Sequence, residues 1–257
     1  ATRSMIGAAN ALVITNNSGT PTTQIDVDAA DSFLINSSGN GIRTGTVNLT
    51  INAATTGANG LDTGALGNNT WYYVYIISNG TTTAGLLSTS ATAPTMPSGY
   101  TYKYCVGAVT TLGAATFIRF LQKGNRTQYV VVSGSTTPNL PTIQSQTGSS
   151  TGSISVPTWV AASVSSFVPP TAISIDLIAR VNGDGASGGL IAAPNNAYGP
   201  LSSGTNPPPV SMSHTYRSNV YANFVLESSN IYWARAGDGD DFGGIFCQGW
   251  VDAVNAN

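Results

Sequence analysis

The chain has 257 residues, 8% of them charged, and a formal net charge of -2 at pH 7. An ordinary soluble domain has about 25% charged residues, so this surface is expected to be unusually neutral. Hydrophobic residues make up 41% of the chain, which excludes a disordered polar tail. Nine scattered Lys and Arg residues do not make a nucleic-acid-binding surface. The apolar runs are shorter than the ~20 residues that span a bilayer, so membrane insertion is not expected.

The polar residues indicate the fold class. They are mainly uncharged Ser, Thr and Asn, together with 29 Gly, and Glu227 is the single glutamate. Residues that favour exposed helix faces are therefore scarce, whereas Val, Ile, Tyr and Thr are frequent in strands. The composition predicts an all-β protein.

Short runs with strand composition recur between turn-forming clusters in the first half of the chain. TVNLTI (46–51) alternates apolar and polar residues, which is typical of a half-buried strand. WYYVYIIS (71–78) is apolar on both faces and predicts a central strand that ends at the hairpin signal Asn79-Gly80. Further strands are expected at residues 11–15, 24–27, 102–109, 116–122 and 127–132. This regular spacing predicts a β-sandwich of the jelly-roll type.

The second half has a similar pattern. Alternate residues from Ile173 to Val181 are apolar and share one face of a predicted strand, with Asp176 and Arg180 on the other face. A polar, Pro-rich passage at residues 194–209 then leads to three further strand-like runs, NVYANFVL, NIYWARA and FGGIFCQGWVDA.

A stretch with linker composition lies near the middle of the chain. Residues 133–153 are rich in Ser, Thr and Gly and separate two β-rich halves, 1–132 and 154–257. A polar linker of this length can return along the edge of a sandwich. We therefore expect residues 1–257 to form a single β-sandwich unit.

Two matches to catalytic motifs fail in their context. GSSTG (148–152) fits the nucleophile-elbow pattern, but no helix pattern follows and the only histidine is His214. GDGASG (183–188) fits a dinucleotide-binding pattern, but it also precedes no helix pattern, and no acidic residue follows at roughly 20 residues. The sequence predicts no catalytic residue and no cofactor, so we expect a protein that is not an enzyme.

Carboxylates and thiols are the remaining candidates for chemistry. Asp238, Asp240 and Asp241 supply hard oxygen ligands in the GDGDD segment, but the EF-hand spacing is missing. A polar turn is the favoured interpretation, and no metal site is predicted. Cys105 and Cys247 lie in apolar strand patterns, which favours free buried thiols over a bridge and leaves the bridge open.

Residues 60–109 carry a distinctive combination of motifs. GLDTG is followed by a short spacer, an NTWYY strand and then STSATAPTMPSGY. This combination resembles a module of tailed-phage tail-fibre-like virion proteins, and the closing GWVDA also fits. Pro and Gly in these motifs fix tight turns. The motif residues, with a structural role, are Gly60, Leu61, Asp62, Thr63, Gly64, Trp71, Tyr72, Tyr73, Pro94, Pro97, Gly99, Tyr100, Gly249 and Trp250.

The resemblance implies a non-enzymatic structural protein on the virion surface, outside the cell. Its role would be tail-fibre-type host recognition or capsid decoration, and its partners other virion proteins, with a host-surface glycan as a further candidate. A homotrimer is expected, because few charges protect the strand edges and Tyr and Trp are frequent at interfaces.

Two other classes stay open. A secreted carbohydrate-binding or adhesin module would use the aromatic residues between Trp71 and Tyr104 as a stacking platform. A glycan-degrading enzyme would use carboxylates that are dispersed in the sequence.

Overall fold

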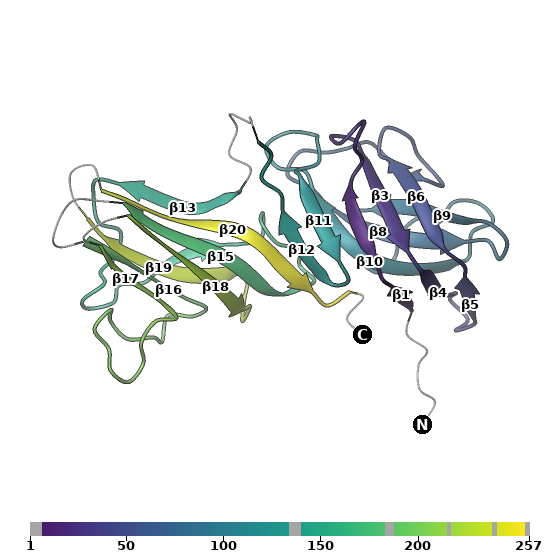
Figure 1. The fold of residues 1–257 in the computed structure, drawn as a ribbon. Helices are drawn as coiled ribbons and strands as arrows, with labels where there is room; N and C mark the ends of the chain where they lie inside the picture. The colour runs from purple at the N-terminus through teal and green to yellow at the C-terminus, as the bar shows by residue number, and fades with distance from the viewer. Residues whose placement is uncertain (1–6, 134–139, 183–187, 215–216, 238–240, 255–257) are drawn as a thin grey trace, which may run out of the picture. The chain divides into compact units, whose positions relative to one another are not determined.

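The structure is a computed structural model that describes residues 7–133, 140–182, 188–214, 217–237 and 241–254 (Figure 1). Every regular element within these ranges is a β-strand, and the strands form stacked sheets. The prediction of an all-β sandwich fold is confirmed. The described residues contain no helix with the length and apolar character needed to cross a membrane.

The chain divides into two compact units. The first unit contains Ala1–Gly134 and Val251–Asn257, and the second contains Ser135–Trp250. A single β-sandwich unit formed by residues 1–257 stays a prediction. We describe each unit by itself, and limited proteolysis that yields two stable, separately folded halves would refute the single unit.

Two sheets face each other in the first unit. One has the order β1 (Ala8–Asn10), β4 (Asp31–Ile35), β10 (Tyr102–Thr110), β8 (Trp71–Ser78), β9 (Thr83–Ser88) and β7 (Gly60–Leu61), with β5 (Gly41–Thr44) paired to β4. The other contains β12 (Arg126–Tyr129), β11 (Phe120–Lys123), β2 (Val13–Asn16), β3 (Gln24–Ala29) and β6 (Val47–Asn52). All pairs are antiparallel except β7 with β9.

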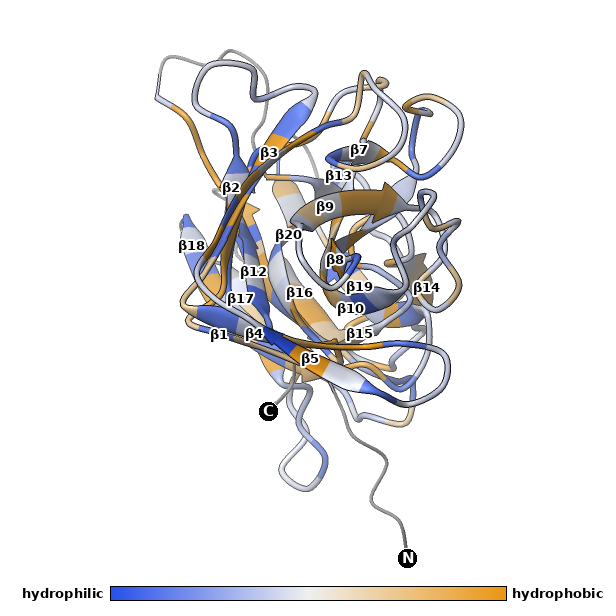
Figure 2. Ribbon diagram, turned by 90° about the vertical axis from the view of Figure 1, so that its right-hand side faces the viewer, coloured by the Kyte–Doolittle hydropathy of each residue, from blue (hydrophilic) through white to orange (hydrophobic). Residues whose placement is uncertain are grey.

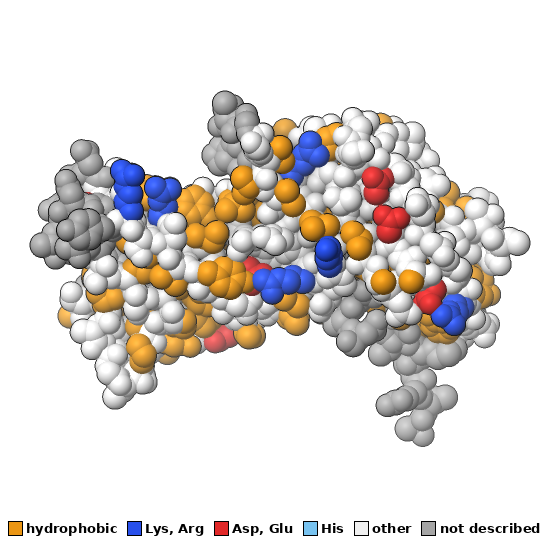
Figure 3. Space-filling model, viewed as in Figure 1, with side chains coloured by type: hydrophobic (Ala, Val, Ile, Leu, Met, Phe, Trp, Pro, Cys, Tyr) orange, Lys and Arg blue, Asp and Glu red, His pale blue; other side chains and the backbone are white. Residues whose placement is uncertain are grey.

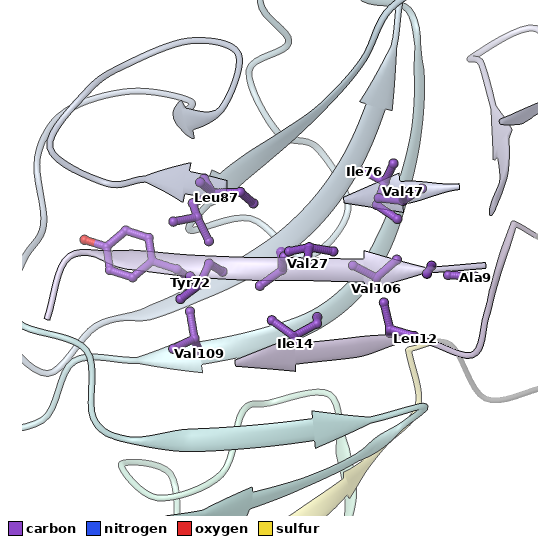
Figure 4. Packing of buried hydrophobic residues seen from close by; sticks show 14 of the residues in the cluster. Ala9, Leu12, Ile14, Val27, Val47, Tyr72, Ile76, Leu87, Val106 and Val109 are labelled. Carbon is purple, nitrogen blue, oxygen red and sulfur yellow. The ribbon is translucent and has the colours of Figure 1, made fainter. Parts of the chain in front are cut away.

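The core of the first unit lies between these sheets. Along β3, partly exposed and buried residues alternate, as expected for a strand with one face on the core. Figure 4 shows the buried side chains that meet from the two sheets, among them Ile14, Val27, Tyr72, Val106 and Val109. Strand β9 is hydrophobic (orange in Figure 2), and its residues 84–88 are buried.

Strand β8 confirms the prediction for residues 71–78 and is buried on both faces. Its alternate residues Tyr72, Val74 and Ile76 belong to the core cluster between the sheets. The intervening residues Tyr73, Tyr75 and Ile77 belong to a second buried cluster on the outer face of the same sheet. The hairpin that follows has Gly80 in a left-handed conformation, with φ of 100°.

The second unit also contains two sheets. One has the order β18 (Ser218–Val225), β15 (Ala172–Asn182) and β20 (Phe242–Asp252), and β13 (Thr142–Thr147) pairs with β20. The other has the order β14 (Val160–Ser163), β19 (Asn230–Ala236), β16 (Gly188–Ala193) and β17 (Val210–His214). Residues Ile175, Leu177, Ala179 and Val181 are buried as predicted, but Ile173 is 47% exposed.

Part of the stretch with linker composition, residues 133–153, forms regular structure. Thr142–Thr147 form strand β13, which pairs antiparallel with β20. Thr151 then makes an isolated bridge to Arg235. Ser, Thr and Gln occur in flexible linkers and also on exposed edge strands, so composition alone does not distinguish the two.

Candidate functional site

The motif residues between Gly60 and Tyr100 come together in the first unit. Gly60 and Leu61 form β7 and pair with Leu86 and Leu87 of β9. Gly60 is required at its position, because a Cβ there would lie 2.5 Å from the carbonyl oxygen of Thr55. The chain is thereby brought to the edge of β9, where the GLDTG turn begins.

Asp62 joins the GLDTG turn to the STSATAP segment. The backbone N–H of Thr95 donates a hydrogen bond of 3.0 Å to Asp62 Oδ2, and the N–H of Asp62 donates one of 2.7 Å to Leu87 O. Thr63 and Gly64 are exposed, and Gly64 has φ of 73°. This carboxylate therefore holds a loop in place, although 33 residues separate its partner from it.

Residues 89–101, the covering loop, lie over the outer face of β8, β9 and β10. Met96 and Tyr100 of this loop pack against the cluster that contains Tyr73, Tyr75 and Leu86. Pro94 is buried, and the Tyr100 N–H donates to Pro97 O at 3.1 Å. Gly99 has φ of 83°, which permits the turn back into β10.

Tyr75 of β8 holds the covering loop in place through a hydrogen bond. Its hydroxyl donates a hydrogen bond of 2.9 Å to Ser90 O. Burial raises the pKa of Tyr75 well above its ordinary value of 10.0, with the nearby Cys105 as a further cause. The phenol therefore stays protonated and acts as a neutral donor.

Tyr72 and its neighbours fasten the turn that precedes β8. The N–H of Gly67 donates to the Tyr72 hydroxyl at 2.7 Å, and Thr111 Oγ1 donates to Gly67 O at 2.6 Å. The Gly113 N–H donates to Asn69 Oδ1 at 2.8 Å. The ring of Tyr72 meets Phe117 edge to face at 6.3 Å between centroids.

In these contacts the motif residues hold loops and turns of the first unit in place. Tyr72, Tyr73 and Tyr75 are 2–4% exposed, so their rings are not available as a platform for a sugar. Trp71 and Tyr100 are half-buried and pack against the cluster under the covering loop. Gly249 and Trp250 lie on β20 in the second unit, where Trp250 is buried.

The next residues to place are those of the two catalytic-motif matches and the carboxylates of the GDGDD segment. GSSTG (148–152) is a loop in which Gly148 and Gly152 have positive φ, and no helix follows among the described residues. Most of GDGASG and also Asp238 and Asp240 lie outside the described residues. Asp241 is buried, and no group of three metal-ligating side chains occurs in the part of the chain that the structure describes.

Both cysteines are free thiols. Burial raises the pKa of Cys105 to about 12 and also raises that of Cys247 above its ordinary value of 9.0. Thiolates are the reactive form of cysteine, so neither side chain is suited to act as a nucleophile at neutral pH.

Sequence reasoning missed the polar residues that the structure buries. Arg235 is 1% exposed and donates to Ser149 O and Asp241 O. Gln122 is also 1% exposed and donates to Val106 O and Gly124 O, both at 2.7 Å. The only local signal is a polar residue within an apolar strand pattern.

Comparison with known proteins gives one family match. The family described as Mtd second domain matches residues 12–108, which is less than half of the chain. The chain is similar to that family over this range, which includes the motifs from Gly60 to Tyr100. No curated protein matches the chain.

A solved structure with weak similarity is the crystal structure of a Bacillus thuringiensis Cry1Da tryptic core variant. It is 8% identical, and the match covers 96% of this chain and 52% of that one, with a TM-score of 0.20. The chain therefore spans about half the length of that protein. A TM-score of 0.20 does not indicate a shared fold.

Proposed function

We propose that the protein is a non-enzymatic structural protein of the surface of a tailed-phage virion. It acts outside the cell, in tail-fibre-type host recognition or in capsid decoration. The observation that supports this proposal is the assembly of GLDTG, NTWYY and STSATAP, the motifs that carry the resemblance. Asp62, Tyr72 and Tyr75 use their polar atoms to hold loops in place, which is the role of a scaffold.

The surface is compatible with such an assembly. On the face drawn in Figure 3, a few charged side chains lie among uncharged polar and hydrophobic atoms. The net charge of -2 gives little long-range repulsion between copies. Other virion proteins and further copies of this chain are the partners we propose, with a homotrimer as the assembly.

Electron microscopy of purified particles tests the location. Antibody fragments raised against the purified protein should label the particles, at the tail tip for host recognition or over the head for decoration. Peptides of the chain should also be present in gradient-purified particles by mass spectrometry. A chain that is expressed during infection but missing from purified particles would refute the proposal.

Light scattering tests the trimer. The chain has a mass of 26.3 kDa, so the proposal requires three times this mass for the purified protein at micromolar concentration. A mass that stays at 26.3 kDa on concentration contradicts a trimer that forms without the particle.

A further inference from the structure

The loop between β16 and β17, residues 194–209, forms an open hollow in the second unit. The hollow has a volume of about 410 Å³ and is lined by Asn195, Ala197, Tyr198, Thr205, Asn206 and Pro207. Loops of this length without strands of their own are uncommon in compact domains and usually have a function. None of the motif residues discussed above lies in this loop.

Hydrogen bonds within the loop fix its shape. The Gly199 N–H donates to Asn206 O at 2.8 Å, and the Asn206 N–H donates to Ser203 Oγ at 3.0 Å. Gly199 is required there, because a Cβ would lie 2.7 Å from Ser203 Oγ. The Ala197 N–H donates to Asn195 Oδ1 at 2.9 Å. The residues that line the hollow therefore belong to a preorganised backbone.

Two contacts anchor this loop to the core of the second unit. Leu201 packs against the buried cluster that contains Ile154 and Ile191. Trp159 packs on the same cluster, and its Nε1–H donates to Tyr198 O at 3.1 Å. The backbone of Tyr198, a residue that lines the hollow, is thus held to the core.

Asn195 connects the hollow to a carboxylate. Its Nδ2 donates to both oxygens of Glu227, at 3.0 and 2.9 Å. Glu227 also lines a second hollow of about 340 Å³, whose other residues are mainly apolar, among them Val168, Pro169 and Leu226. The single glutamate of the chain therefore lies between a polar hollow and an apolar one.

These groups indicate the chemical class of the ligand. A carboxylate oriented by an amide still has lone pairs that accept hydroxyl protons, and the amides of Asn195 and Asn206 both donate and accept. The rings of Tyr198 and Pro207 offer apolar faces. Among the described residues that line the two hollows none is Lys or Arg, and Glu227 repels anions, which argues against a phosphate or nucleotide. We propose that this part of the second unit binds a neutral saccharide.

This inference rests on the proposed function for its biological role, because a saccharide on the host surface is what a recognition protein would contact. Its test does not need the particle. Saturation-transfer NMR of the purified full chain with the methyl glycosides of glucose, galactose and N-acetylglucosamine should show transfer to at least one of them. The third probe carries an acetyl group that the apolar hollow can accommodate.

Three variants assign the binding to these residues. Glu227→Gln keeps the size of the side chain and removes its charge, and Asn195→Ala removes the amide that orients it. Each should weaken binding at least about tenfold, which corresponds to about 1.4 kcal/mol. Asn10→Ala is the matched control, because it breaks an amide–carboxylate contact to Asp31 of 2.6 Å in the first unit, and it should leave binding unchanged.

Transfer to none of the three glycosides would overturn the inference, and so would binding that neither hollow variant weakens or that Asn10→Ala weakens as much. If antibody fragments against the protein label virions but the protein binds no glycoside, only this inference is overturned. A chain that binds a glycoside through Glu227 but is missing from particles overturns only the proposed function.

Discussion

Gly85→Ala is expected to destabilise the first unit through a clash at the centre of its core. A Cβ at Gly85 of β9 would lie 2.3 Å from Cγ1 and 2.4 Å from Cδ1 of Ile51, which is fully buried on β6. The favourable separation of two such carbons is roughly 3.5–4.0 Å. Asn59 prevents β9 from moving away, because it accepts from the Gly85 N–H at 2.8 Å and donates its own N–H to Gly85 O at 2.7 Å.

The size of the effect follows from this geometry. Overpacking a filled core costs about 1–3 kcal/mol, and the restrained strand favours the upper part of that range. Replacing Gly by Ala also lowers the conformational entropy of the unfolded chain, which stabilises the folded protein by about 0.4–1 kcal/mol. We therefore expect a net loss of about 2 kcal/mol in the free energy of unfolding. Gly45→Ala is the control, because a Cβ there meets nothing within 4 Å.

Urea and thermal unfolding measure this loss, and a double-mutant cycle tests its cause. Ile51→Ala alone should cost about 2–5 kcal/mol because it leaves a cavity. The double mutant Gly85→Ala/Ile51→Ala should lose clearly less stability than the sum of the losses of the two single mutants. The reason is that the new methyl group then occupies space that the Ile51 side chain has left. Strictly additive costs, or a loss at Gly85 no larger than that at Gly45, would refute this reasoning.

Three further predictions concern polar groups and thiols. Asp62→Ala should lower the stability by about 1 kcal/mol in urea unfolding by removing the acceptor of the Thr95 N–H, and Asp62→Asn should cost less. Hydrogen bonds from Arg43 and Asn10 hold the pKa of Asp31 below its ordinary value of 3.8. Its stabilising contribution is therefore present above pH 3.8 and lost as the pH falls through the lowered pKa, so the stability difference between the wild type and Asp31→Asn should shrink there. A chromogenic disulfide reagent at neutral pH should modify neither cysteine in the folded protein and both in denaturant.

The sequence predicts the strands of the first unit well where the information is local. The run at residues 71–78 is apolar on both faces, and β8 has these bounds and is buried on both faces. The same pattern implies that something covers the outer face. It does not identify the covering loop, because the contacts that place it, from Asp62 to Thr95 and from Tyr75 to Ser90, join residues that are distant in the sequence.

The sequence is less informative where composition has two meanings. Residues 133–153 have the composition of a linker, yet Thr142–Thr147 pair with β20. The loop at 194–209 is polar and Pro-rich like many surface loops, and hydrogen bonds between Gly199, Ser203 and Asn206 help to fix its shape. These hydrogen bonds join residues that are three and seven positions apart in the loop, and the Pro-rich composition does not indicate them.

Arg235 is the clearest case of a buried polar residue that its sequence context does not reveal. Its guanidinium donates from Nη1 to Ser149 O and from Nη2 to Asp241 O, and it thereby joins two loops of the second unit. Burial lowers the pKa of Arg235, and the charge of Asp241 opposes this shift. A lysine cannot reproduce two divergent donors in a plane, yet it keeps the charge that must be buried.

Arg235→Lys should therefore cost about 3 kcal/mol in the free energy of unfolding, because it leaves a buried charge with incomplete partners. Arg235→Met loses the same hydrogen bonds but buries no charge, so it should cost less than the lysine variant. Calorimetry distinguishes the two units at the same time. If the two units unfold separately, Arg235→Lys lowers the transition temperature of the second unit, and Gly85→Ala lowers that of the first. A lysine variant as stable as the methionine variant would contradict the electrostatic argument, and a single transition that both variants lower would contradict separate unfolding.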